Sequence, residues 1–165
     1  MEKLKLDEIQ NNLTCRLQIT EMNISKNCKR AKLSRNTHYR LINNKNEIYL
    51  KTFFKIATFF NITPSDLLFS LINNSEFKKS EDEITYLIDT TTLTNELKNA
   101  MNQLREVGKS IEYLFFNDDR LIDQRQFSYI LAGKGFSLKS FLIVCELLEI
   151  DPIKFIKKIT REEKL

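Results

Sequence analysis

Residues 132–137 contain a Gly-Lys pair, which in nucleotide-binding loops helps to hold phosphate. Such a loop also needs a glycine five residues before the pair and a serine or threonine directly after it. Ser128 and Gly135 occupy these two positions. The segment therefore lacks the spacing of a phosphate loop, and we expect no nucleotide site there.

Other residue types that carry chemistry are sparse. The spacing of Cys15, Cys28 and Cys145 matches no zinc motif, and each lies in an apolar helical pattern, so we expect reduced packing residues. Carboxylates cluster at residues 81–83 and 118–119 without a neighbouring base or metal ligand, which indicates solvated turns. These observations predict a protein that has no metal site, needs no cofactor and is not an enzyme.

The composition favours a helical protein. The chain has 165 residues, which allows one domain or two small ones, and 42% of them are hydrophobic. Only three Gly and two Pro are present, which favours helices with short connections over a turn-rich β-sandwich. No apolar run approaches the roughly 18 residues of a membrane span, and the N-terminus lacks the long apolar region of a signal peptide. We therefore expect a cytoplasmic location and no membrane partner.

Charge is distributed unevenly along the chain. Residues 1–70 carry 12 Lys and Arg against 6 Asp and Glu, residues 71–95 carry 2 against 5, and residues 96–165 carry 12 against 11. A basic first part suits a phosphate-binding surface, because each phosphate contact releases condensed counterions. The charge count alone does not distinguish a phosphate-binding surface from an ordinary solvated one. The positions of the charged residues on the helices are needed to distinguish the two.

Amphipathic periodicity predicts helices along most of the first 70 residues. Asn23 and Ser34 are good N-caps for the second and third helices, and Thr63 with Pro64 begins the fifth. Asn44 tolerates the left-handed conformation that ends the third. The expected helices are residues 6–21, a short segment from 24, a segment after 34 to about 43, residues 50–60 and a segment from 64.

The pattern of the fourth and fifth helices recurs near the C-terminus. Residues 138–152 align without gaps on residues 50–64, and Leu, Lys, Phe, Ile and Pro repeat at an offset of 88. Residues 129–134 parallel residues 40–45 at an offset of 89. Duplication of one five-helix unit explains this most simply, and chance similarity of amphipathic helices is the alternative.

An acidic segment separates the two copies. Within it, residues 84–92 are rich in β-branched side chains and form either a short strand or an extended tether, which the sequence leaves open. Thr94 can cap a helix over about residues 95–107. We therefore expect an all-α fold with units at residues 1–70 and 94–165, joined by a linker at residues 71–93.

Residues 34–45 read Ser-Arg-Asn-Thr-His-Tyr-Arg-Leu-Ile-Asn-Asn-Lys. This segment resembles the recognition helix of the Cro/phage-repressor helix-turn-helix family, also called the xenobiotic-response-element family. The resemblance covers about residues 6–69 and, more loosely, residues 94–159, in which residues 108–115 resemble the start of a second helix and residues 123–134 a recognition helix. It implies two tandem five-helix units of the lambda-repressor-like fold, the second one divergent, and a sequence-specific DNA-binding function.

A recognition helix enters the major groove by its N-terminal end, so the residues just after its cap meet base edges. With Ser34 as the cap, Arg35, Asn36 and Tyr39 project on one exposed face, with Arg40 alongside. Arg can make bidentate contacts with guanine, and Asn with adenine. Contacts with the phosphates of double-stranded DNA are expected from Lys26, Lys29, Ser34 and Lys45.

Both copies depart from the family pattern. The first has Lys32 where the family often has Gly in the turn, and Asn27 and His38 where apolar residues are usual. We expect His38 to be a partly buried, hydrogen-bonded packing residue. The second copy has a longer, acidic turn at residues 117–122 that would repel phosphate, so this copy is either a second DNA site or a packing partner. Its candidate DNA contacts are Gln124, Arg125, Ser128 and Lys134.

Two functions from different classes fit these observations. The first is a repressor-like transcriptional regulator that binds DNA as an internal pseudo-dimer or as a homodimer formed through the second unit. The alternative is a protein-interaction module on the same fold, such as an antitoxin-like protein or a phage or plasmid adaptor, without direct DNA readout. Lys, Ile and Asn number 18, 18 and 15, a bias typical of AT-rich coding DNA from a low-GC bacterium, its plasmid or its phage.

Overall fold

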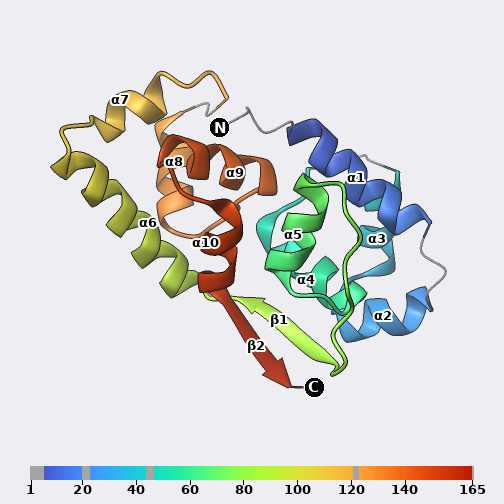
Figure 1. The fold of residues 1–165 in the computed structure, drawn as a ribbon. Helices are drawn as coiled ribbons and strands as arrows, with labels where there is room; N and C mark the ends of the chain where they lie inside the picture. Colours follow the sequence, from blue (N-terminus) through green and yellow to red (C-terminus); the bar gives the residue numbers. More distant parts are fainter. Residues whose placement is uncertain (1–5, 20–22, 44–46, 121–122, 165) are drawn as a thin grey trace.

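The computed structural model describes residues 6–19, 23–43, 47–120 and 123–164 (Figure 1). These residues form five helices and a strand, followed by five more helices and a strand. The first series comprises α1 (Leu6–Gln18), α2 (Ile24–Arg30), α3 (Arg35–Ile42), α4 (Leu50–Phe60), α5 (Pro64–Ile72) and β1 (Ile84–Ile88). The second comprises α6 (Thr90–Glu106), α7 (Ile111–Phe116), α8 (Gln124–Leu131), α9 (Leu138–Leu147), α10 (Pro152–Ile159) and β2 (Thr160–Lys164). None of the described helices is long and apolar enough to span a membrane.

The N-caps predicted for the first half are confirmed. Asn23, Ser34 and Thr63 precede α2, α3 and α5, and each side chain accepts a hydrogen bond from a backbone N–H of the first turn. Pro64 takes the first position of α5, where an N–H would have no partner within the helix. The second half is capped in the same way, by Ser110, Asp123, Ser137 and Asp151. The predicted end of the third helix at Asn44 lies outside the described residues.

The fold is mostly helical but not all-α, which corrects the expected fold class. β1 and β2 form a two-stranded antiparallel sheet. Of the two alternatives for residues 84–92, the strand is therefore correct for the part that forms β1. The helix expected from about residue 95 begins at Thr90 instead, because the Asp89 side chain caps it by accepting from the N–H of Thr92 (3.0 Å).

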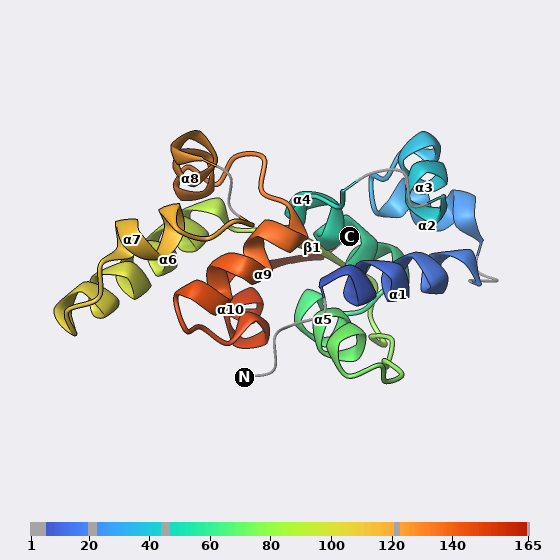
Figure 2. The ribbon, with the colours of Figure 1, turned by 90° about the horizontal axis from the view of Figure 1, so that it is seen from above.

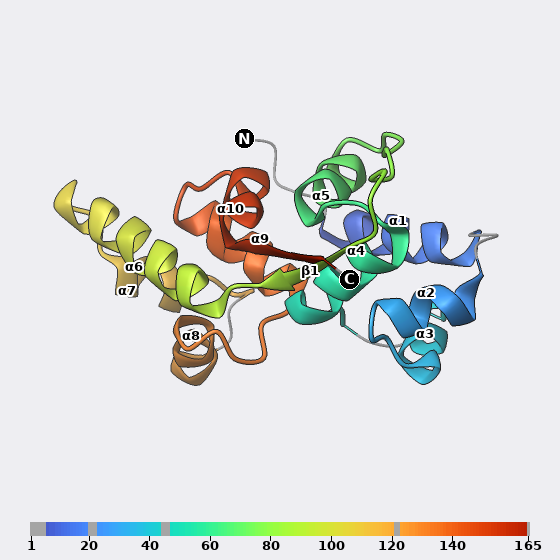
Figure 3. The ribbon, with the colours of Figure 1, turned by 90° about the horizontal axis from the view of Figure 1, so that it is seen from below.

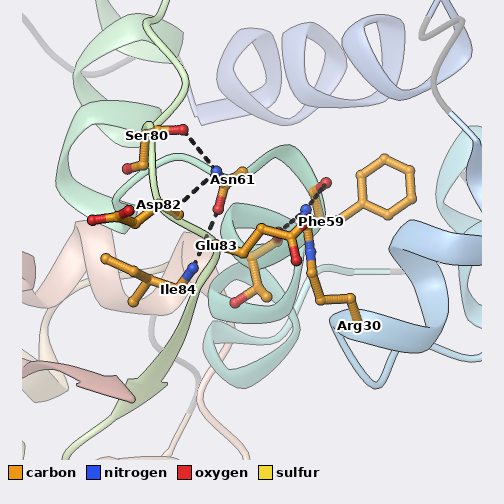
Figure 4. Close-up of polar contacts among 8 residues, drawn as sticks. Arg30, Phe59, Asn61, Ser80, Asp82, Glu83 and Ile84 are labelled. Carbon is orange, nitrogen blue, oxygen red and sulfur yellow. Dashed lines mark hydrogen bonds and ion pairs between the residues drawn. The ribbon is translucent and has the colours of Figure 1, made fainter. Parts of the chain in front are cut away.

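Asn61 connects the end of α4 to the segment that leads into β1 (Figure 4). It ends α4 in the left-handed conformation, with a φ of 56°. Its Nδ2 donates to the carbonyl oxygens of Ser80 (2.8 Å) and Asp82 (3.1 Å), and its Oδ1 accepts from the N–H of Ile84 (3.4 Å). One side chain thus both ends a helix and fixes the start of a strand.

Arg30 joins α2 to the same place (Figure 4). Its Nη2 donates to the carbonyl oxygens of Thr58 (2.9 Å) and Phe59 (3.1 Å), and its Nη1 forms a salt bridge with Glu83 (3.1 Å). Carbonyls in the last turn of a helix have no partner within the helix, so the guanidinium supplies donors to them, in addition to the N–H of Asn61 that donates to Thr58 (3.1 Å). β1 is therefore tied to both α2 and α4.

The two halves of the chain meet along helices that hold the same place in each series. α4 packs against α9, and α5 packs against α10. At the starts of α4 and α9, the N–H of Leu50 donates to the carbonyl of Phe136 (2.6 Å), and the N–H of Leu138 donates to the carbonyl of Ile48 (2.8 Å). Each donor and each acceptor lies 88 positions from its counterpart, so the two bonds are reciprocal. One hydrophobic core cluster extends through both halves.

Candidate DNA-binding surface

A tight turn joins α2 to α3 and sets the start of α3. Lys32, in this turn, has a φ of 51°, a left-handed conformation that glycine adopts at lower cost. Its neighbours Ala31 and Leu33 are buried, and the N–H of Leu33 donates to the carbonyl of Cys28 (2.9 Å). The Ser34 hydroxyl then accepts from the N–H of Thr37 (3.0 Å) and begins α3.

The predicted base-reading residues lie on the exposed face of α3. Arg35, Asn36, Tyr39 and Arg40 are all exposed. The Arg35 guanidinium donates to the hydroxyl of Ser25, which ties this side chain to α2. The exposed face of α3 therefore presents an amide, a phenol and two guanidinium groups, of which the one on Arg35 is held by Ser25.

Positive charge surrounds this end of α3. Lys26 and Lys29 of α2 and Lys32 of the turn are exposed, and none of the three forms a salt bridge within the described part of the chain. Arg30 is different, because its guanidinium is occupied by α4 and Glu83. Lys45, the remaining predicted phosphate contact, lies outside the described residues.

The opposite face of α3 packs inward through His38. The sequence predicted a hydrogen-bonded packing residue at this position, and this prediction is half correct. His38 is a packing residue, only 6% exposed, and its ring centroid lies 5.6 Å from that of Phe59. However, its Nε2 has no hydrogen-bond partner among the described residues. Burial lowers the pKa of His38, so the ring is neutral at pH 7.

Two of the three cysteines are buried as predicted, and the third is not. Burial raises the pKa of the Cys28 and Cys145 thiols, and at Cys28 the nearby Arg35 opposes this effect. Cys15 is exposed on α1, which corrects its expected place in the core. In the described ranges, no group of three or more His, Cys, Asp or Glu is arranged to hold a metal ion.

The second half presents a comparable helix pair, α7 and α8. The ring centroids of Phe115 in α7 and Phe127 in α8 lie 4.6 Å apart. The Arg125 guanidinium is held by its own helix, because Nε donates to the hydroxyl of Tyr129 (3.1 Å) and the group lies 5.5 Å from the centroid of that ring. All four side chains predicted as candidate contacts are exposed, namely Gln124, Arg125, Ser128 and Lys134.

The acidic turn between α7 and α8 is partly neutralised within the protein. Asp118 accepts from Nη2 (2.8 Å) and Nε (3.0 Å) of Arg120, whose Nη1 also donates to Glu146 of α9 (3.0 Å). The hydrogen bond with Asp118 is the largest cause that raises the pKa of Arg120. Asp118 therefore repels phosphate less than the sequence alone indicates, whereas Asp119 is exposed.

Figure 2 shows α3 and α8 at opposite ends of one face of the molecule, and Figure 3 shows the same arrangement from the other side. Tyr49, between them, is 52% exposed. It lines an open cleft of about 280 Å³ beside α3 and another of about 340 Å³ beside α8. Tyr49 could not be predicted from the sequence, because an aromatic residue before a helix has no distinctive pattern.

Two further exposed aromatic side chains, which the sequence motifs did not indicate, lie on α7. Tyr113 is 67% exposed and Phe116 is 49% exposed. A residue-by-residue alignment of α7 with α2 from their N-caps would have found them, because it places them at the positions of Lys26 and Lys29.

A comparison with protein families identifies the first half of the chain. Residues 12–69 match the family model described as the Cro/C1-type HTH DNA-binding domain. The match runs from within α1 to within α5 and includes α2, the turn and α3. No curated protein and no solved structure matches the chain. Residues 12–69 are therefore a Cro/C1-type helix-turn-helix DNA-binding domain.

Proposed function

We propose that this protein is a repressor-like transcriptional regulator that binds specific double-stranded DNA by inserting α3 into the major groove. The observation that carries the proposal is the exposed N-terminal face of α3 within a Cro/C1-type domain. In this motif the N-terminal residues of the recognition helix contact base edges. Arg35 and Arg40 suit guanine, Asn36 suits adenine, and Tyr39 completes the reading face.

In this proposal, Lys26 and Lys29 of α2 contact the phosphates of the DNA backbone. Ser34 and the N-terminal N–H groups of α3 have the same role, and so does Lys45. Helix N-termini favour anions because their first N–H groups have no partner within the helix. Phosphate contacts position the protein without carrying sequence information. They also make the affinity fall steeply as the salt concentration rises.

The proposal includes the second half of the chain, residues 94–165 beyond the linker 71–93, as a divergent copy of the unit formed by residues 1–70. Asn61 and Glu149, 88 positions apart, follow α4 and α9 with the same φ of 56°. The two clefts on the shared face also involve corresponding positions of α3 with α4 and of α8 with α9. The corresponding lining residues are Thr37 and Gln126, Arg40 and Tyr129, Leu41 and Ile130, Tyr49 and Ser137, and Thr52 and Ser140.

The reciprocal hydrogen bonds at the starts of α4 and α9 support a two-fold relation between these copies. In a two-fold interface, the contact of one side with the other is repeated with the roles exchanged, as for Leu50 with Phe136 and Leu138 with Ile48. α3 and α8 then meet successive major grooves, about 34 Å apart, in inverted orientation. We favour this internal pseudo-dimer over a homodimer, because the α4–α9 and α5–α10 contacts already lie within one chain.

Selection of bound duplexes from a random pool tests the proposed function, and two variants test the placement of α3. Arg35→Ala is expected to weaken binding to the selected duplex by about 1–3 kcal/mol and to relax the base preference at one position. Lys26→Ala is expected to weaken binding to the selected duplex and to random duplexes by the same factor. If each variant lost the same affinity for the selected duplex as for random duplexes, α3 would not be the helix that reads the bases.

The salt dependence of binding separates this function from a protein-interaction module. A DNA-binding protein with several phosphate contacts loses affinity for generic duplex DNA steeply between about 50 and 200 mM salt. An adaptor without DNA readout shows no binding even at the lower concentration. Absence of binding there would contradict the proposed function.

A further inference from the structure

The N-caps allow the two helix pairs to be compared residue by residue. Asn23 and Ser110 begin α2 and α7, which sets an offset of 87, and Ser34 and Asp123 begin α3 and α8, which sets an offset of 89. Each of the four side chains accepts a hydrogen bond from the backbone N–H three residues later. The alignment therefore rests on a shared local structure.

Buried positions agree with this alignment. Phe115 falls at the position of Cys28, and Phe127 falls at the position of His38. Cys28, His38 and Phe115 are buried, and Phe127 is half-buried against Phe115. The inward faces of the two helix pairs thus correspond, and so the outward faces can be compared as well.

On the outward face of α7, aromatic residues replace the two lysines of α2. Tyr113 stands at the position of Lys26, and Phe116 stands at the position of Lys29. All four side chains are exposed. At the places where the first half offers two ammonium groups to a DNA backbone, the second half therefore offers none.

The same loss extends to the start of α8. Gln124 stands at the position of Arg35, and Tyr129 stands at that of Arg40. The cap itself is the carboxylate of Asp123, where α3 has the neutral hydroxyl of Ser34. A negative charge at this point disfavours an approaching phosphate, so the helix end is less suited to backbone contact.

α8 nevertheless keeps side chains that can read bases. Gln124 can make a bidentate contact with adenine, and Arg125 can make one with guanine if it leaves Tyr129. Lys134, exposed after α8, stands at the position of Lys45 and offers a phosphate contact. The second half is thus poor in phosphate contacts but retains base-reading groups.

We propose that the protein reads an asymmetric DNA site composed of two unequal, inverted half-sites. The half-site under α3 provides most of the phosphate contacts, whereas the half-site under α8 is contacted mainly through base edges. This inference rests on the proposed function and adds the form of its DNA target. It follows from the two-fold placement of α3 and α8 combined with the unequal charge of their surroundings.

Hydroxyl-radical footprinting of the full chain on its selected duplex tests this form. We expect strong backbone protection over one half-site and weak protection over the other. We also expect the selected sequence to differ between the two halves. Equal protection of two identical inverted half-sites would overturn the inference and leave the proposed function intact. Failure to select any duplex would contradict both the proposed function and this inference.

A gain-of-charge variant provides the sharper test. Tyr113→Lys with Phe116→Lys restores the two α2 lysines on α7 and is expected to strengthen protection of the weak half-site. Two added phosphate contacts steepen the plot of log affinity against log salt by about 1.8, so the loss between 50 and 200 mM salt becomes about tenfold larger. Tyr113 is 67% and Phe116 49% exposed, and Phe116 also contacts Phe127 edge-on, with 5.9 Å between the ring centroids, so circular dichroism first checks that the variant keeps its helices.

The matched control is Phe69→Lys with Leu87→Lys, which adds the same charge at exposed positions on α5 and β1. It is expected to leave the footprint unchanged and to change the salt dependence much less. If the control steepened the salt dependence as much as the α7 variant, or if the α7 variant left the weak half-site unprotected, α7 would not face DNA and the inference would fail.

Discussion

Tyr49 and Ser137 face each other across an antiparallel backbone bridge, although they lie 88 positions apart, the offset at which the sequence pattern repeats. In the proposed internal pseudo-dimer, these two residues are counterparts that meet close to the two-fold axis. The two side chains differ, because Tyr49 is 52% exposed whereas Ser137 is buried and caps α9. The surface is therefore unequal even at the point where the two halves meet.

The hydrogen bond from Leu50 to Phe136 can be tested without removing a hydrogen bond within α4. Leu50 is the first residue of the helix, where proline is tolerated, and Tyr49 before it has the extended ψ of 148° that a following proline requires. Leu50→Pro removes the N–H donor and leaves the Phe136 carbonyl unpaired. We expect it to be less stable than Leu50→Ala by about 1–3 kcal/mol.

Urea unfolding followed by circular dichroism measures this difference. Both variants lose most of the buried Leu50 side chain, so their comparison reports on the N–H group, less the roughly 0.4–1 kcal/mol that proline gains by restricting the unfolded chain. Equal free energies of unfolding would mean that the reciprocal hydrogen bonds do not hold the two halves together.

Lys32→Gly is expected to stabilise the protein. A residue other than glycine in the left-handed conformation costs about 1–3 kcal/mol, and glycine avoids this but loses about 0.5–1 kcal/mol in chain entropy. We therefore expect a gain of about 1 kcal/mol in the free energy of unfolding. Lys32→Ala, the control, removes the same charge but keeps the strain. If the alanine variant were as stable as the glycine variant, the backbone of Lys32 would not be strained.

Local patterns predicted the elements that have either an apolar stripe at helical spacing or a strong N-cap. α4 was expected at residues 50–60 and has these bounds, because Phe53, Ile56 and Phe60 recur at helical spacing and are all buried. The face of α3 could be predicted in the same way, since Ser34 sets the helix start and thereby the direction of Arg35 and Asn36.

Non-local relationships could not be predicted. β2 has the sequence Thr-Arg-Glu-Glu-Lys, which lacks an apolar alternation, and it is a strand only because β1 is held in place by Asn61 and Arg30 and offers a partner. Sequence repetition likewise gives no information on whether two copies are related by rotation or by translation. The reciprocal hydrogen bonds of Leu50 and Leu138 join segments that are far apart in the sequence, so only the folded structure reveals them.

Asn61 offers a test of how β1 is held. Asn61→Gly keeps the left-handed backbone but removes the side-chain hydrogen bonds with Ser80, Asp82 and Ile84, and we expect a loss of about 1–3 kcal/mol in the free energy of unfolding. The amide of Ile84 should lose protection from hydrogen exchange. Asn74→Gly is the matched control, because Asn74 is exposed and also left-handed, with a φ of 48°. If both variants exchanged equally at Ile84, the Asn61 side chain would not anchor the strand.

His38 predicts a specific pH dependence of stability. It is the only histidine of the chain, it is buried beside Phe59, and burial lowers its pKa below the ordinary value. The unfolded chain, with an ordinary histidine pKa of about 6.5, therefore binds a proton at a pH where the folded protein does not. Above about pH 7 the titration of His38 costs the folded protein no stability. As the pH falls through about 6.5 the free energy of unfolding decreases, because protonation of the histidine favours the unfolded state.

His38→Leu removes this titration and also the unpaired Nε2 atom. We expect the variant to be more stable than the natural chain by about 1 kcal/mol at pH 7.5, because a buried polar atom without a partner is removed. The advantage should grow as the pH falls from 7 to 5. Urea unfolding of both proteins at several pH values measures it, and the carboxylates that titrate at lower pH cancel in the comparison. An advantage that stayed constant across this range would mean that His38 is protonated equally in the folded and unfolded chains, so that its burial on the inner face of α3 does not control its charge.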